Sequence, residues 1–216
     1  MKKGIIFDVD GVLVDSMPYH ASAWVHAFAT VGIEVKESEI YEIEGSNHVG
    51  VIDLIFKKAG KVPEPELYGD LLLEKRSHFM EHNVSQPFDH MQECLVDLKS
   101  KYKLAVASGA DRTIVTSIMG KIYPNIFDAI VSGQDVKKGK PDPEPYLKAA
   151  GMLGLDARDC IVIENAPLGV LSAKNAGMYC VAVPTYLPSE KLKDADLLLA
   201  DHAGLVEYLN KLAANG

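Results

Sequence analysis

The chain has 216 residues, of which 48% are hydrophobic, and a formal net charge of −8 at pH 7. This length is enough for one core, or for a core with a smaller module. The acidic balance argues against a nucleic-acid partner, because binding to phosphate backbones requires clustered Lys and Arg. Only VKKGKP, at 136–141, is a basic cluster, and it could hold a small anionic substrate.

Targeting signals and cysteines narrow the class of protein further. No stretch approaches the ~20 uncharged apolar residues of a membrane span. The start MKKGIIFD has an acidic residue, Asp8, too early for the apolar region of a signal peptide. We therefore expect an intracellular, cytoplasmic protein with no membrane partner. Cys94, Cys160 and Cys180 are odd in number and far apart, which predicts buried thiols rather than disulfides or a zinc site.

Five short apolar runs predict the strands of a parallel sheet that is covered on both faces. Each run is rich in Ile, Val or Ala and ends in polar or glycine-containing sequence. Helical patterns lie between most of them, and those at 144–154 and 168–178 are closed by Gly, which often ends a helix. The alternation predicts a doubly wound α/β domain. The runs are KGIIF at 3–7, KLAVAS at 103–108, AIVSG at 129–133, CIVIEN at 160–165 and YCVAV at 179–183.

The pattern changes between residues 17 and 87. No strand-like run occurs there, and helical periods are interrupted by GIEVKES, EGSNH and AGKVPEPE. This predicts a helical cap domain over 17–87, inserted into a core formed by 1–16 and 88–216. We expect a ligand to bind in the cleft between the two units.

Polar residues follow three of the predicted strands. The carboxyl ends of strands form the binding edge of an open α/β sheet, so these groups should converge. Any one of them could be ordinary turn chemistry, but three strands that end in such groups favour a functional site. The residues are Asp8 and Asp10, Ser108 and Gly109, and Glu164 and Asn165.

The pair Asp8 and Asp10 predicts specific chemistry. Two carboxylates in one crevice either share a proton or hold a cation. With Mg²⁺ bound, Asp8 can stay ionised as a nucleophile, while Asp10 carries and returns a proton. Ser108 and nearby backbone N–H groups would hold phosphate oxygens, and Lys140 would supply fixed positive charge.

Four stretches, DVDGVLVDS, VASGADR, KKGKPDPEPYL and IVIENAPLGVLSAKNAGM, resemble in order the motifs of the haloacid dehalogenase superfamily. The similarity covers essentially the whole chain and points to the branch of β-phosphoglucomutase and sugar-phosphate phosphatases, with a Rossmann-like core and a helical cap. It implies a phosphoaspartyl intermediate on Asp8, acid–base work by Asp10, and phosphate contacts from Ser108 and Lys140. It further implies that Mg²⁺ is held by Asp8, the Asp10 carbonyl and the fourth motif.

The fourth motif departs from the family pattern. Where two acids are usual, Glu164 is followed by Asn165. An amide oxygen can bind Mg²⁺ but brings no charge, so metal affinity should fall unless Glu164 compensates directly or through water.

His20 and Lys75 are the main candidates for cap residues that reach the site. His20, Trp24, Ala27 and Val31 form one helical stripe, in which His20 is either a core histidine or, by the resemblance, a residue that orients Asp10. Lys75 lies within an apolar arc, so it either snorkels to water, the favoured alternative, or points into the cleft and contacts substrate.

Two further histidines on the same predicted helix are weaker candidates for a functional role, that of metal ligands. His78 and His82 have i,i+4 spacing, but a solvated face is the preferred interpretation, because no third metal ligand is evident.

The resemblance leaves hydrolysis and phosphoryl transfer between sugar hydroxyls to be distinguished. Mutases hold a second phosphate with an Arg in the loop that reads EGSNHVG here, and His48 occupies that place. A neutral imidazole is a poor substitute for a guanidinium, although Arg76 or Arg112 could serve instead.

Hydrolysis of a small phosphorylated metabolite, such as a sugar phosphate, is therefore the preferred function. A sugar phosphomutase and a phosphate-binding protein without turnover are the alternatives. We expect a monomer.

Overall fold

The sheet at the centre of the molecule has six parallel strands. The computed structural model describes residues 2–215. The strand order β3-β2-β1-β4-β5-β6 places β1 in the middle, with Gly4 paired to Lys103 on one side and to Cys160 on the other. All five predicted strands are present, and the prediction missed only the two-residue β6. The strands are β1 (Gly4–Phe7), β2 (Lys103–Ala107), β3 (Ala129–Val131), β4 (Cys160–Glu164), β5 (Tyr179–Ala182) and β6 (Leu197–Leu198).

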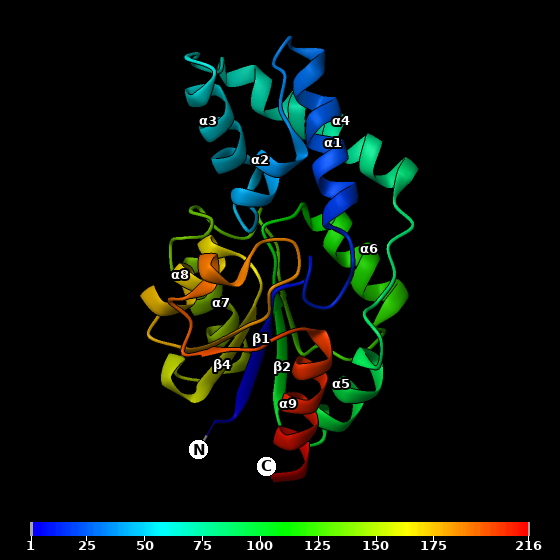
Figure 1. The fold of residues 1–216 in the computed structure, drawn as a ribbon, viewed down its shortest axis with the longest axis vertical. Coiled ribbons are helices and arrows are strands. Elements are labelled where there is room, and N and C mark those ends of the chain that lie inside the picture. The colour runs from blue at the N-terminus through cyan, green and yellow to red at the C-terminus, as the bar shows by residue number, and fades with distance from the viewer. Residues whose placement is uncertain (1, 216) are drawn as a thin grey trace.

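Helices cover both faces of this sheet, as the prediction of a doubly wound α/β fold requires (Figure 1). Side chains alternate along β1, so Ile5 and Phe7 join one hydrophobic cluster and Ile6 joins the other. The first cluster lies under α5 (Met91–Lys99), α6 (Arg112–Ile122) and α9 (His202–Asn215). The second lies under α7 (Glu144–Leu153) and α8 (Pro167–Asn175). Two short 3₁₀ turns, η1 (Ala157–Asp159) and η2 (Ser189–Leu192), complete the core.

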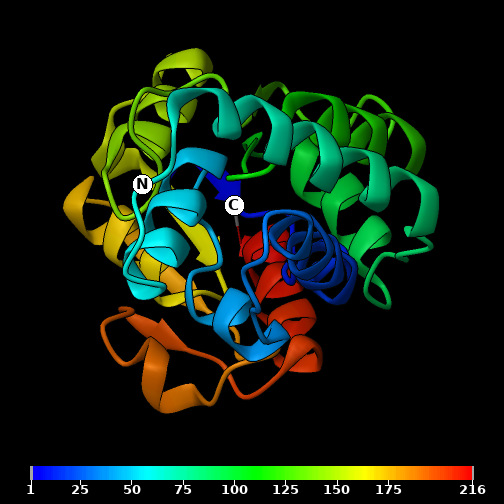
Figure 2. The same cartoon turned by 90° about the horizontal axis from the view of Figure 1, so that it is seen from above.

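The segment between β1 and α5 is helical, as predicted, and lies above the sheet (Figures 1 and 2). Its third hydrophobic cluster includes Trp24 from the first helix and Phe56 from the third. Pro18 lies in the first helical turn, where its missing N–H is harmless. The cap helices are α1 (Met17–Thr30), α2 (Glu37–Glu42), α3 (His48–Lys58) and α4 (Pro65–His82).

The loop between α2 and α3 is seated directly on the core. A Cβ placed on Gly109 would lie 2.4 Å from the carbonyl oxygen of Ser46, and one placed on Gly139 would lie 2.7 Å from the backbone nitrogen of Asn47. These glycines are therefore required by the close approach of the two units, and the structure shows the cap closed over the sheet edge.

Two further local predictions, on the glycines that end helices and on the cysteines, are confirmed. Gly154 and Gly177, which follow α7 and α8, have φ values of +67° and +70°, the left-handed conformation that glycine adopts without strain. The three cysteines are free and buried. Among residues 2–215, no helix combines the length and the apolar character needed to cross a membrane.

Candidate active site

A cavity of about 50 Å³ lies between the cap and the carboxyl edge of the sheet. Both units line it, as expected for a ligand site at a domain junction. The core contributes Asp8, Asp10, Gly109, Ala110 and Asp111, and polar cap residues on its wall include His20, Glu44, Ser46, His48 and Lys75.

The sheet brings the predicted core residues together. Phe7, the last residue of β1, pairs with Val106 on one side and Ile163 on the other. The residues that follow these strands therefore emerge side by side, and the backbone N–H of Asp8 still donates to the carbonyl of Ile163 at 2.9 Å. The expected convergence at this edge is what the structure shows.

Lys140 bridges two buried acids of this group. Its Nζ lies 2.6 Å from Oδ1 of Asp8 and 2.6 Å from Oε1 of Glu164. Burial raises the pKa of Asp8 to about 8, helped by the charges of Glu164 and Asp10 and opposed by Lys140. Burial alone would lower the pKa of Lys140, but the two acids outweigh it and raise that pKa. Lys140 thus supplies a fixed positive charge beside Asp8.

Both oxygens of the Glu164 carboxylate accept hydrogen bonds. Its Oε1 accepts from Lys140 and, at 2.7 Å, from the hydroxyl of Tyr146. Its Oε2 accepts from the backbone N–H groups of Asn165 and Ala166 at 2.8 and 2.9 Å. These contacts indicate that Glu164 holds Lys140 in place. They do not favour the direct contact between Glu164 and a metal that the sequence predicted.

Asp10 is held by three donors. Its Oδ1 accepts from Ser16 Oγ at 2.6 Å and from His20 Nε2 at 2.9 Å, and its Oδ2 accepts from Ser108 Oγ at 3.0 Å. Burial would raise the pKa of Asp10, but its interactions with His20 and Ser16 outweigh burial and hold that pKa well below its usual value. Asp10 is therefore ionised in this arrangement, with Ser108 turned toward it.

Lys75 points into the cleft, so the favoured expectation that it snorkels to water was wrong. Its side chain is 3% exposed and its Nζ lies 2.7 Å from Nδ1 of His20. The rings of Trp24 and Phe79 flank the ammonium, with centroids 5.7 and 5.1 Å away, and their π faces replace part of its lost hydration. Burial lowers the pKa of Lys75 to about 8 and also lowers the pKa of His20.

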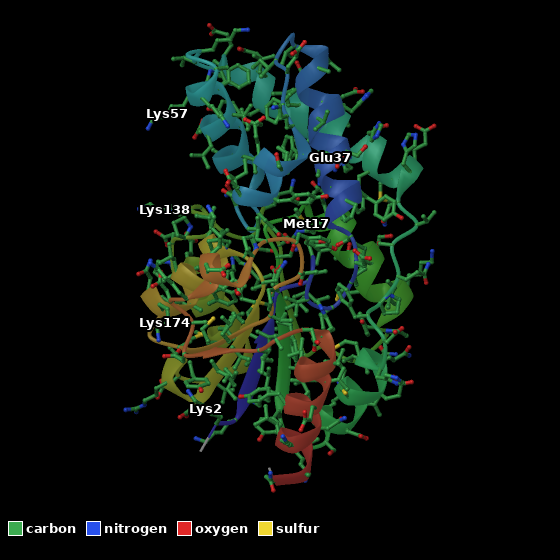
Figure 3. The ribbon with its side chains drawn as sticks, viewed as in Figure 1. Lys2, Met17, Glu37, Lys57, Lys138 and Lys174 are labelled. Atoms are coloured by element: carbon green, nitrogen blue, oxygen red, sulfur yellow. The ribbon has the colours of Figure 1, made fainter. Side chains whose placement is uncertain are left out.

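The other basic residues considered for phosphate binding differ in whether they line the cavity. His48 lines the cavity, whereas Arg76 contacts Asp111 and Thr113, with Nη1 3.5 Å from Oδ2 of Asp111 and 3.5 Å from Oγ1 of Thr113. Arg112 pairs with Asp135. In the basic cluster only Lys140 enters the site, since Lys138 projects from the outer edge of the core, far from Met17 at the cap junction (Figure 3).

The histidines of the outer cap face stack on one another. The rings of His26 and His78 stack with centroids 4.3 Å apart, and those of His78 and His82 stack at 4.2 Å. Within residues 2–215, no three acid, His or Cys side chains are grouped as metal ligands.

Two acids of the site were not predicted from the sequence. Glu44 reaches down from the loop between α2 and α3, is 5% exposed, and accepts from Asn165 Nδ2 at 3.0 Å. Burial, followed by the charge of Asp8, raises the pKa of Glu44 well above its usual value. Asp111 caps α6 through Oδ1, which accepts from the Thr113 N–H at 2.9 Å. No periodicity marks either residue, because both lie in loops.

The oxygens present at the edge fit a divalent cation. Asp8 offers a carboxylate, Asp10 a backbone carbonyl, and Asn165 Oδ1 is buried without a hydrogen-bond partner. Such hard oxygen donors suit Mg²⁺. The buried acids of residues 2–215 (Asp8, Asp10, Glu44, Asp111 and Glu164) outnumber the buried lysines Lys75 and Lys140, so these groups would carry a net negative charge if all were ionised, and a bound cation would neutralise it.

A doubly wound sheet that gathers two aspartates, a serine and a lysine beneath a helical cap is typical of a hydrolase with a Rossmann-like core and a cap. Residues 5–183 match the model of the haloacid dehalogenase-like hydrolases, and the chain belongs to this family. The resemblance found in the four sequence motifs is thereby confirmed.

Named relatives include both a hydrolase and a mutase. The chain is 31% identical to hexitol phosphatase A of Escherichia coli over 91% of its own length and 90% of the relative. It is 30% identical to β-phosphoglucomutase of Bacillus subtilis, covering 94% of this chain and 91% of that one. The crystal structure of CbbY from Rhodobacter sphaeroides in complex with phosphate superposes with a TM-score of 0.81 at 26% identity, covering 95% and 96% of the two chains.

Proposed function

We propose that this protein is a Mg²⁺-dependent phosphatase that hydrolyses a small phosphorylated metabolite through a phosphoaspartyl intermediate on Asp8. The observation that carries the proposal is the buried Asp8 carboxylate at the cavity, 2.6 Å from Lys140 and two residues before Asp10. Family membership and the phosphatase among the relatives support the same chemistry.

Asp8 would attack the phosphorus, and the bond from phosphorus to the leaving oxygen would break. Lys140 holds the attacking carboxylate in place and offers positive charge to the phosphoryl oxygens. A cation bound by Asp8, the Asp10 carbonyl and Asn165 would supply further charge neutralisation. Glu164 acts through Lys140.

Asp10 would move the protons. As an acid it gives a proton to the leaving oxygen, and as a base it takes one from the water that attacks the phosphoaspartate, which releases phosphate and restores Asp8. The ionised state of Asp10, stabilised by His20 and Ser16, matches the second of these roles.

The cap charges favour hydrolysis over a mutase reaction. A mutase must hold a second phosphate in the cap. Apart from His20, which is hydrogen-bonded to Asp10, the basic side chains that the described cap residues offer to the cavity are Lys75 and His48. Lys75 is bound to His20, and burial lowers the pKa of His48, so its ring is neutral near pH 7. Neither replaces the paired donors of a guanidinium.

The cap loop packs closely on the core beside the cavity, so we expect the cap to move away from the core when a sugar phosphate enters. A substrate panel should therefore be graded by the size of the leaving group, from pyrophosphate and acetyl phosphate to polyol, hexose and hexitol phosphates.

Release of free phosphate from this panel with Mg²⁺ tests the proposal, with Asp8→Asn beside the wild type. Asp97→Asn, on the exposed face of α5, is the control for loss of one negative charge. Phosphate release with the wild type and the control, but not with Asp8→Asn, supports the proposal.

Other outcomes contradict it. Phosphorus NMR that shows phosphate moving between carbons without release would establish a mutase. Activity retained in Asp8→Asn would remove Asp8 as nucleophile, and binding without turnover would indicate a phosphate-binding protein.

A further inference from the structure

Glu44 and Asn165 make a direct contact between the cap and the core. Glu44 lies in the loop that follows α2, and Asn165 follows β4. Oε1 of Glu44 accepts from Nδ2 of Asn165 at 3.0 Å, and the two side chains belong to residues that are 5% and 1% exposed. An acid from the inserted unit therefore reaches the position at which the family motif usually has a second acid of the core.

Each of these side chains has one oxygen without a hydrogen-bond partner. Oε2 of Glu44 and Oδ1 of Asn165 are both buried and unpaired. An ionised carboxylate can only accept, so Asn165 must turn its Nδ2 toward Glu44 and its Oδ1 away. Buried acceptors are normally satisfied, and two at one contact indicate a missing positive partner.

The basic side chains of the site are already engaged. Lys140 contacts Asp8 and Glu164, and Lys75 contacts His20. Among residues 2–215, no Lys, Arg or His nitrogen lies within ion-pair distance of Glu44. An ionised Glu44 would therefore have no counter-ion within the described chain, whereas a bound cation would supply one.

We propose that Glu44 is a ligand of the divalent cation, contributed by the cap, and that its carboxylate replaces the negative charge that the core lacks at Asn165. Oε2 of Glu44 and Oδ1 of Asn165 contact the same cation, while Oε1 holds the amide in the required orientation. The inference rests on the cation site of the proposed function but concerns which unit of the protein completes it.

Cap closure and cation binding are then coupled. Gly45, next to Glu44, has a φ of +88°, and a Cβ there would lie 3.1 Å from Cδ of Lys140, so this loop is packed against the core site. A cation that binds Glu44 favours the seated loop, and by reciprocity the seated loop raises affinity for the cation.

Cation binding without substrate tests the inference. Isothermal titration with Mg²⁺, and electron paramagnetic resonance with Mn²⁺, should show about 10- to 100-fold weaker binding in Glu44→Gln, the range expected when a group supporting a metal site is lost. The new amide can still accept from Asn165, so the cap contact persists. Glu42→Gln, which removes an exposed charge two residues away, is the matched control and should bind as the wild type does.

The double variant Glu44→Gln/Asn165→Asp moves the carboxylate from cap to core and reverses the hydrogen bond. We expect it to recover affinity to within about threefold of the wild type. Equal Mg²⁺ affinity in Glu44→Gln and wild type, or a double variant as weak as Glu44→Gln, would overturn the inference. Neither result depends on turnover, whereas the proposed function is tested by phosphate release and Asp8→Asn.

The coupling has its own readout, because Trp24 is the one tryptophan of the chain and lines the cavity on the cap side. Mg²⁺ should shift its fluorescence to shorter wavelength in the wild type and in Glu42→Gln, and should do so only at higher concentration in Glu44→Gln. Emission that responds to Mg²⁺ identically in all three proteins would contradict the coupling.

Discussion

Nζ of Lys75 lies 2.7 Å from Nδ1 of His20, and the opposite nitrogen of that ring lies 2.9 Å from Oδ1 of Asp10. Because an ammonium group can only donate, Nδ1 accepts and Nε2 carries the proton that is donated to Asp10. The pKa of His20 is lowered by burial, which agrees with a neutral ring. A lysine of α4 thereby sets the tautomer of the histidine that holds the site acid.

The buried Lys75 makes stability depend on pH. Its pKa is lowered from 10.5 to about 8, so the unfolded chain binds more protons between these values and stability rises with pH across that window. Replacing Lys75 by Met should remove this rise. The free energy of unfolding of the wild type relative to Lys75→Met should increase by about 3 kcal/mol between pH 7.5 and 10.5, as measured by urea unfolding. Parallel pH profiles for the two proteins would show that Lys75 is not desolvated.

Removing Lys140 leaves buried acids without a partner. We expect Lys140→Met to lower the free energy of unfolding at pH 7 by about 3 kcal/mol, the low end for a broken buried pair, because Asp8 can take up a proton. Lys138→Met, at a side chain that is 76% exposed, should change it by less than about 0.5 kcal/mol. A Lys140 variant as stable as its control would mean that Asp8 and Glu164 do not depend on this cation.

Tyr146 holds Glu164 at Oε1, the oxygen that also contacts Lys140. Its hydroxyl donates to Oε1 at 2.7 Å in a fully buried setting. Tyr146→Phe should cost about 1.5–3 kcal/mol, as for a hydrogen bond to a charged group. Tyr179→Phe, with a ring that is 38% exposed, is the matched control, and chemical unfolding of the two variants compares them. Equal stabilities would argue that water replaces the Tyr146 hydroxyl.

Gly109 determines how closely the cap approaches. A Cβ there would lie 2.4 Å from Ser46 O and 2.6 Å from Gly45 O, so Gly109→Ala should push the loop off the core. We expect Trp24 emission at longer wavelength and phosphate release at least about tenfold slower, with the fold retained.

The control for this variant is Gly120→Ala, in α6, where an added Cβ meets nothing within 4 Å. It should leave activity unchanged and stabilise the protein by up to about 1 kcal/mol. If Gly109→Ala behaves in the same way, closure of this loop does not matter for turnover.

Much of the core half of the site could be predicted. Asp8, Ser108 and Glu164 each end or follow an apolar strand run, and parallel strands deliver their carboxyl ends to one edge whatever the details of packing. The glycines after α7 and α8 were predictable for a similar reason, since a left-handed residue ends a helix locally. Strand β6 was missed because two residues carry no alternation to detect.

The cap half could not be predicted in the same way. Periodicity placed Lys75 on an apolar arc but could not tell whether that arc faced water or another charged group. Its direction depends on α1 packing against α4, which brings His20 within reach. Glu44 and Asp111 lie in loops, where no period exists.

The sequence by itself determined the α/β core, the helical insertion and the convergence of Asp8, Asp10 and Ser108, because strand alternation, helix ends and parallel topology are encoded over short distances. Only the tertiary structure decided that Lys75 is buried against His20, that Glu164 holds Lys140, and that Glu44 meets Asn165 across the junction. Those contacts join residues 24 to 121 positions apart. The first forms when α1 and α4 pack within the cap and the second when distant segments pack within the core, whereas the third forms only when the two units close on each other and exclude water from their polar groups.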